Sequence, residues 1–73
     1  MYYETSGGRF SRGDSITKGT EHLRLAAEQF MMVGHHDKEE GDAKLGENWL
    51  KIATNLEQIA KLAISMATQS RIQ

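Results

Sequence analysis

The sequence contains no cysteine and no proline among its 73 residues. The lack of cysteine excludes disulfide bonds and thiolate metal sites, and the lack of proline removes the strongest helix breaker. No apolar run approaches the ~20 residues that a membrane span needs, and residues 1–14 contain no hydrophobic stretch of the kind found in signal peptides. We therefore expect a cytoplasmic or intravirion protein that is not secreted and has no membrane partner.

A strong excess of charge of one sign is also missing. The formal net charge is −1 and the isoelectric point is about 6.3, whereas a nucleic-acid-binding domain usually carries a strongly basic face. The lysines of the C-terminal half, Lys44, Lys51 and Lys61, alternate with Glu47 and Glu57, which is typical of a solvated face with salt bridges. Nucleic acid is therefore kept as an alternative partner and is not favoured.

A chain of this length forms one small domain, whose single core rarely supplies more than ~3–5 kcal/mol of stability. Small proteins gain additional stability from disulfides, a metal ion or self-association. Because disulfides are excluded here, self-association is the route that we favour, and a metal site without thiolates is the alternative.

The clearest pattern is a helical one in the C-terminal half. Apolar residues recur there at steps of four and three, which indicates one face of a long helix over about residues 43–70. They are Leu45, Trp49, Ile52, Leu56, Ile59, Ala63 and Met66. A second row of small residues, seven apart, runs beside them and permits close approach of a neighbouring helix; it consists of Gly46, Ala53, Ala60 and Ala67.

A second helix is predicted over about residues 15–40. Ile16, Leu23, Ala27 and Phe30 share one face of it. Side-chain oxygens suited to capping its first turn belong to Asp14, Ser15, Thr17 and Thr20. Residues 1–14, with three glycines and no periodic apolar face, are predicted to form a flexible or extended arm.

The stretch Gly34–Asp42, GHHDKEEGD, offers two positions for the turn between the helices. In one, Gly34 ends the first helix and Asp37 caps the second. In the other, Gly41 follows the end of the first helix and Asp42 caps the second. The second choice gives helices of nearly equal length, so we favour it. Either choice predicts an all-α fold, an antiparallel two-helix hairpin.

The same stretch contains His35 and His36 among acidic residues, but the pattern indicates neither a metal site nor a catalytic site. Bundle metal sites place a carboxylate three residues before a ligating histidine, and the residues three before His35 and His36 are Met32 and Val33. A two-helix hairpin also offers no concave pocket for acid–base chemistry. We therefore expect no catalytic residues, no metal ligands, no cofactor and no enzymatic activity.

Two helices cannot enclose a core, so we predict that the hairpin assembles into a helical bundle, in the simplest case a dimer of four helices. The predicted self-association seam consists of Ile16, Leu23, Ala27, Phe30, Leu45, Trp49, Ile52, Leu56, Ile59, Ala63 and Met66. Within the hairpin, Trp49 is expected to face Gly34 and Ala27. The candidate partner face consists of Tyr2, Tyr3, Phe10, Leu25, Met32, Leu50, Leu62 and Ile64.

These features favour a non-enzymatic, self-associating structural or interaction subunit of a larger protein assembly. A phage virion component is one such context, because arms that tie neighbouring subunits together are common there. The alternative is a small dimeric regulator that binds another protein or nucleic acid.

Overall fold

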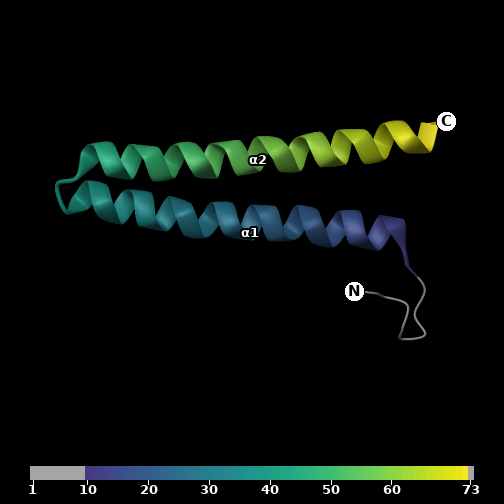
Figure 1. Ribbon diagram of the computed structural model, residues 1–73, viewed down its shortest axis with the longest axis horizontal. Helices are drawn as coiled ribbons and strands as arrows, with labels where there is room; N and C mark the ends of the chain where they lie inside the picture. The colour runs from purple at the N-terminus through teal and green to yellow at the C-terminus, as the bar shows by residue number, and fades with distance from the viewer. Residues whose placement is uncertain (1–9, 73) are drawn as a thin grey trace.

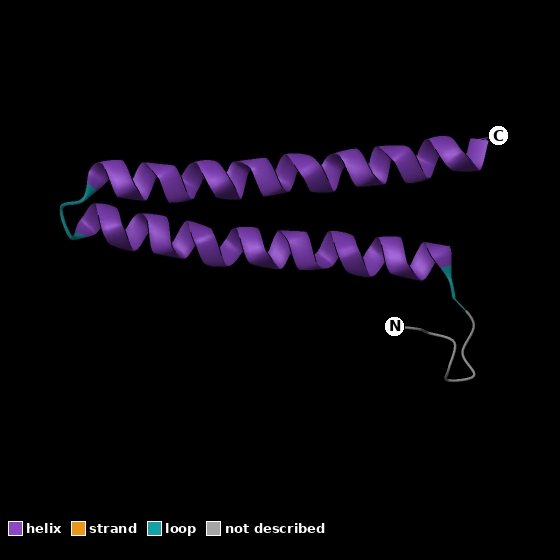
Figure 2. Ribbon diagram, viewed as in Figure 1, coloured by secondary structure: helices purple, strands orange, loops and turns teal. Residues whose placement is uncertain are grey.

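The fold is an antiparallel hairpin of two α-helices, seen in a computed structural model that describes residues 10–72 and the side chains of residues 10–69 (Figure 1). Helix α1 spans Arg12–Glu39 and helix α2 spans Ala43–Ile72. The described part contains helices and short connections only (Figure 2). The all-α hairpin is therefore confirmed.

The start of α1 differs from the expectation of a helix from residue 15. The first turn of α1 contains Arg12, Gly13 and Asp14. These three residues were predicted to belong to the arm, so the helix begins three residues earlier than expected. The capping oxygen also comes from an earlier residue: the Ser11 hydroxyl accepts a hydrogen bond from the Asp14 backbone N–H at 3.2 Å. Ser11 has extended backbone angles, as N-cap residues do. Residues 1–9 of the predicted arm lie outside the described residues.

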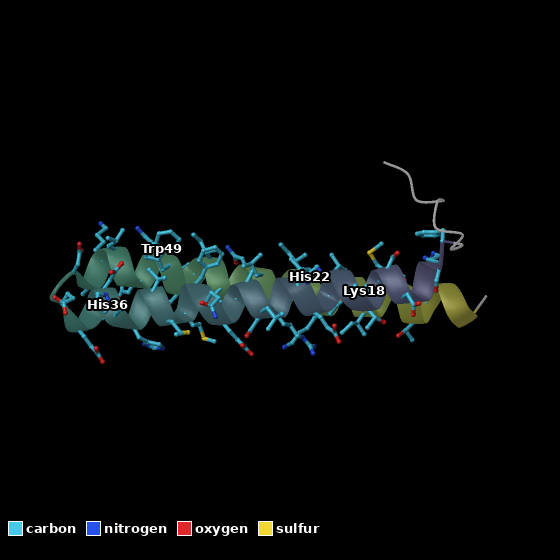
Figure 3. All side chains as sticks on the ribbon, turned by 90° about the horizontal axis from the view of Figure 1, so that it is seen from below. Lys18, His22, His36 and Trp49 are labelled. Atoms are coloured by element: carbon cyan, nitrogen blue, oxygen red, sulfur yellow. The ribbon has the colours of Figure 1, made fainter. Side chains whose placement is uncertain are left out.

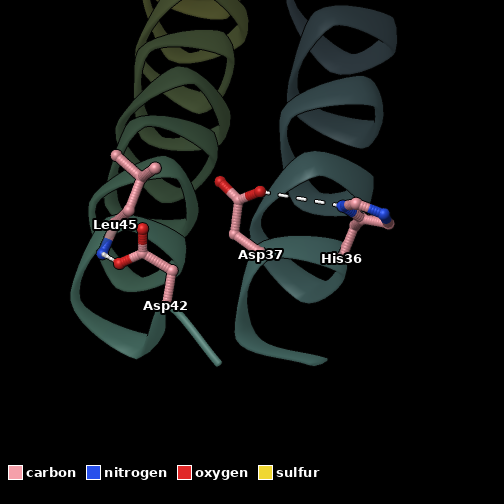
Figure 4. A network of polar contacts seen from close by, with 4 residues as sticks. All are labelled: His36, Asp37, Asp42 and Leu45. Atoms are coloured by element: carbon pink, nitrogen blue, oxygen red, sulfur yellow. Dashed lines mark hydrogen bonds and ion pairs between the residues drawn. The ribbon is translucent and has the colours of Figure 1, made fainter. Parts of the chain in front are cut away.

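The turn lies at Gly41, as the sequence favoured. Gly41 has a φ of +96°, in the left-handed region that favours glycine. Its N–H donates to the Lys38 carbonyl and the Asp42 N–H donates to the Asp37 carbonyl, which is the Schellman pattern that ends many helices. The Asp42 carboxylate then accepts from the Leu45 N–H at 3.4 Å and caps α2 (Figure 4). Three residues therefore connect the helices.

The helices meet along small residues, which we call the small-residue stripe. It consists of Thr20, Ala27 and Gly34 on α1 and Gly46, Ala53 and Ala60 on α2, all of them buried. Each set repeats every seven residues. A Cβ built on Gly34 would lie 2.8 Å from the Gly46 carbonyl oxygen, and one built on Gly46 would lie 2.5 Å from the Gly34 carbonyl oxygen. At this point the two backbones themselves are in contact.

This arrangement corrects the expected environment of Trp49. Gly34 faces Gly46 and the Leu50 side chain, while Trp49 stacks on Phe30 at one side of the stripe, with ring centroids 5.4 Å apart and planes at 19°. The large side chains thus flank the line of contact and do not fill it.

This packing fully buries only small residues and leaves the larger apolar side chains half-buried or exposed. Among the described residues, no side chain larger than threonine is buried. The hydroxyl of the buried Thr20 has no hydrogen-bond partner, which is unfavourable inside a protein. The molecule is a single layer of two helices.

Candidate interaction surface

One broad side of the hairpin carries most of the large apolar side chains, and we call it the apolar face. On α1 it consists of Ile16, Leu23, Ala26, Phe30 and Val33, and on α2 of Leu45, Trp49, Ile52, Leu56, Ile59, Ala63 and Met66. On each helix these residues repeat at steps of three, four and seven, so they form a band beside the small-residue stripe. In antiparallel helices the two bands fall on the same side of the layer.

Contacts between the helices confirm that the two bands share one side. Near the turn, Phe30 of α1 stacks on Trp49 of α2. Figure 3 views the hairpin edge-on, with Trp49 toward the turn end. At the other end, both helices line one open hollow of about 560 Å³. Its lining includes Ile16 and Leu23 of α1 and Ala63 and Met66 of α2. The apolar face therefore runs the length of the hairpin.

The large residues of the face remain exposed in the hairpin. Leu45, Ile52, Ile59 and Met66, which follow one another at steps of seven on α2, keep 40–58% of their surface accessible. Phe30, Trp49 and Leu56 are half-buried. A contiguous exposed apolar patch of this kind is typical of a protein interaction site.

The apolar face also lacks charge. Within residues 16–33 and 45–66, four acidic and four basic side chains occur: Lys18, Glu21, Arg24, Glu28, Glu47, Lys51, Glu57 and Lys61. Their helical positions place all eight on the opposite side or the outer edges of the layer. The rim of the apolar face carries neutral polar residues instead, including Gln29 on α1 and Asn48 and Asn55 on α2. The charged side chains thus lie away from the apolar face, on a side that also carries the exposed Leu25, Met32 and Ile64.

The structure distributes the predicted site residues unevenly. All of the predicted seam except Ala27 belongs to the apolar face, and Ala27 lies on the small-residue stripe. The role of these seam residues in self-association stays a prediction.

The candidate partner residues do not form one surface: Leu50 packs against Gly34 on the opposite side of the stripe, and Phe10 lines the hollow. Leu25, Met32, Leu62 and Ile64 are exposed at other positions. Tyr2 and Tyr3 lie outside the described residues.

Other polar chemistry is sparse in the described part of the chain. His36 Nδ1 lies 3.7 Å from an Asp37 carboxylate oxygen at the turn end of α1 (Figure 4). Within residues 10–72, no three histidine, aspartate or glutamate residues are grouped as metal ligands would be. Neither described helix is long and apolar enough to cross a membrane.

The sequence interpretation missed the small-residue stripe of α1. Gly13, Thr20, Ala27, Gly34 and Gly41 are all seven residues apart, the same step that was recognised in the row from Gly46 to Ala67. Matching two such rows would have identified the line of helix contact. It would also have placed Trp49 beside that line.

Comparisons with protein-family models, with curated proteins and with solved structures give no match for this chain.

Proposed function

We propose that this protein is a non-enzymatic interaction subunit that acts by burying its apolar face against another protein chain, in the first place a second copy of itself. The observation that supports the proposal is the uncharged, exposed band of large side chains along one side of both helices. In a single hairpin that band meets water, while the side chains that are buried contribute little hydrophobic stabilisation.

The size of the face suits a stable interface. A helix of 28 residues is about 42 Å long. Two helices in close contact give a layer about 18 Å wide, so one side covers roughly 750 Å². Stable protein interfaces bury about 800 Å² per partner. One face-to-face contact between two copies would thus reach the usual size.

Assembly of such bundles into a larger structure, for example a virion, follows from the sequence argument and stays a prediction. The opposite side, with four charges of each sign between residues 16–33 and 45–66, would remain in water in a dimer. A dimeric regulator that binds DNA would lose affinity steeply as salt rises, because phosphate contacts release counterions. A salt-dependent DNA-binding measurement therefore separates that alternative from the proposal.

Self-association is tested by light scattering coupled to size-exclusion chromatography of the full chain and of two variants. Ile59→Lys places a charge on the apolar face, and Leu25→Lys places one at a similarly exposed position away from it, since Ile59 is 50% and Leu25 57% exposed. We expect the unmodified chain and Leu25→Lys to be dimers. We expect Ile59→Lys to weaken the dimer about 100-fold or more, because an unpaired buried charge destabilises an interface by ~3–5 kcal/mol.

Circular dichroism of both variants checks that each remains helical. A stable helical monomer for the unmodified chain would contradict the proposal. Equal weakening by both substitutions would show that the apolar face is not the contact surface.

A further inference from the structure

The apolar face differs between its two ends, and this difference carries information about how a second copy docks. At the turn end it carries the stacked rings of Phe30 and Trp49, both of them half-buried. At the open end the helices present Gly19, Thr20, Ala63 and Ala67 to the hollow of about 560 Å³. Small side chains at the floor leave this space unfilled, while larger apolar side chains also line it: Phe10, Ile16, Leu23 and Met66.

We propose that two copies pack through their apolar faces in opposite directions, so that the Phe30–Trp49 stack of each copy enters the hollow of the other. The inference rests on the proposed function and adds the arrangement of the dimer. In this arrangement α1 lies over the partner's α1 and α2 over the partner's α2, each pair antiparallel. The two-fold axis crosses the helices at right angles near their middle.

The helix lengths bring the stack and the hollow to the same level. Trp49 lies six residues after the first residue of α2, and Met66 lies six residues before its last. A two-fold axis through the middle of α2 therefore sets Trp49 opposite the level of Met66 in the second copy, where the hollow lies. Because interfaces pack as densely as protein interiors, aromatic rings placed against the hollow are favoured over an arrangement that leaves the hollow of each copy unfilled.

Charge at the two ends favours the same direction. Residues 36–42 at the turn contain four acidic side chains, Asp37, Glu39, Glu40 and Asp42, against one lysine, Lys38. Arg12 lines the hollow at the open end. Copies packed in opposite directions bring the acidic turn of one toward Arg12 of the other. Copies packed with both turns at one end would bring two acidic groups together, which is unfavourable.

The absence of cysteine from the chain allows a direct test by engineered disulfides between exposed rim residues. The variant Asn48→Cys/Gln69→Cys places both thiols on the rim of α2, too far apart to join within one chain because 21 residues of helix span about 32 Å. In the proposed dimer, Asn48 of each copy and Gln69 of the other lie on the same rim, two residues or about 3 Å apart along the helices. We expect mild oxidation to yield a disulfide dimer linked between positions 48 and 69, identified by peptide mass.

The matched variant is Gln29→Cys/Asn48→Cys, which would form a 29–48 link between chains only if both turns lay at the same end. We expect no such link. A 29–48 link between chains, or no 48–69 link in a protein that light scattering shows to be a dimer, would overturn the proposed direction and leave the proposed function standing. A monomer by light scattering would overturn both.

Discussion

At the scale of single residues, the closest contact in the hairpin is made by atoms that glycine leaves uncovered. Gly34 and Gly46 let the two helix backbones touch, with Leu50 and Lys38 closing over them from one side. Neither glycine is required by its backbone angles, since both lie inside helices. Alanine would favour the helical state at each position by about 1 kcal/mol, so the presence of glycine is explained by the space between the helices.

Replacing Gly34 by alanine is therefore expected to destabilise the protein, because the new Cβ would meet the Gly46 backbone, which cannot move aside as a side chain can. Overpacking destabilises a protein by about 1–3 kcal/mol, and the gain in helix propensity offsets part of this loss. We expect a net loss of about 1–2 kcal/mol in the free energy of unfolding, measured by urea denaturation.

The matched control is Gly13→Ala on the same helix, where a Cβ would have no neighbour within 4 Å. This variant should keep or raise the free energy of unfolding, by at most about 1 kcal/mol, because alanine favours the helical state over glycine. An unchanged stability for Gly34→Ala would mean that the helices separate at little energetic cost.

At the scale of elements, the existence of both helices was predictable from local signals, and the position of the turn was predictable once the near-equal lengths of the two helices were added to those signals. The periodic apolar residues from Leu45 to Met66 indicated α2, and Gly41 followed by Asp42 indicated how one helix ends and the next begins. The line of helix contact was not predicted, because the sequence interpretation placed a large side chain, Trp49, at the contact between the helices. With only two helices, large residues cannot be enclosed, and close approach of the backbones depends on the small ones.

The connection itself gives a prediction at this scale. Gly41→Ala is expected to lower the free energy of unfolding by about 1–2 kcal/mol, because a residue with a Cβ is unfavourable at a φ of +96°. Gly41→Asn should lose less, since asparagine adopts left-handed angles more readily. Thermal unfolding followed by circular dichroism measures both. Equal losses for the two variants would argue that the turn is not held in the left-handed region in solution.

At the scale of the whole molecule, the hairpin is a layer with two unlike sides. The only side chains it buries are alanines and one threonine whose hydroxyl has no partner, among the residues that the structure describes. Folding must offset the conformational entropy of ordering two long helices, and this small core contributes little toward that. Contact between copies would add the burial of the side chains that stay exposed on the apolar face, such as Leu45, Ile52 and Ile59. The fold and the assembly are therefore expected to be coupled.

Coupling of this kind makes stability depend on protein concentration. Each tenfold dilution should remove about 1.4 kcal/mol from the stability of a dimer relative to unfolded chains. We expect the thermal midpoint to fall steadily on dilution for the unmodified chain and for Leu25→Lys. A midpoint that does not change with concentration would show that a single hairpin is stable alone.

The three-residue connection between Glu39 and Ala43 also has a kinetic consequence. Contacts between the helices begin beside the turn, where few residues separate the partners, and continue outward in register. Closing so short a loop takes well under a microsecond, and helices of this length form on a microsecond scale. The low separation of contacting residues gives rapid folding. Encounter of two hairpins would then be the slow step of refolding, and its rate would rise with protein concentration.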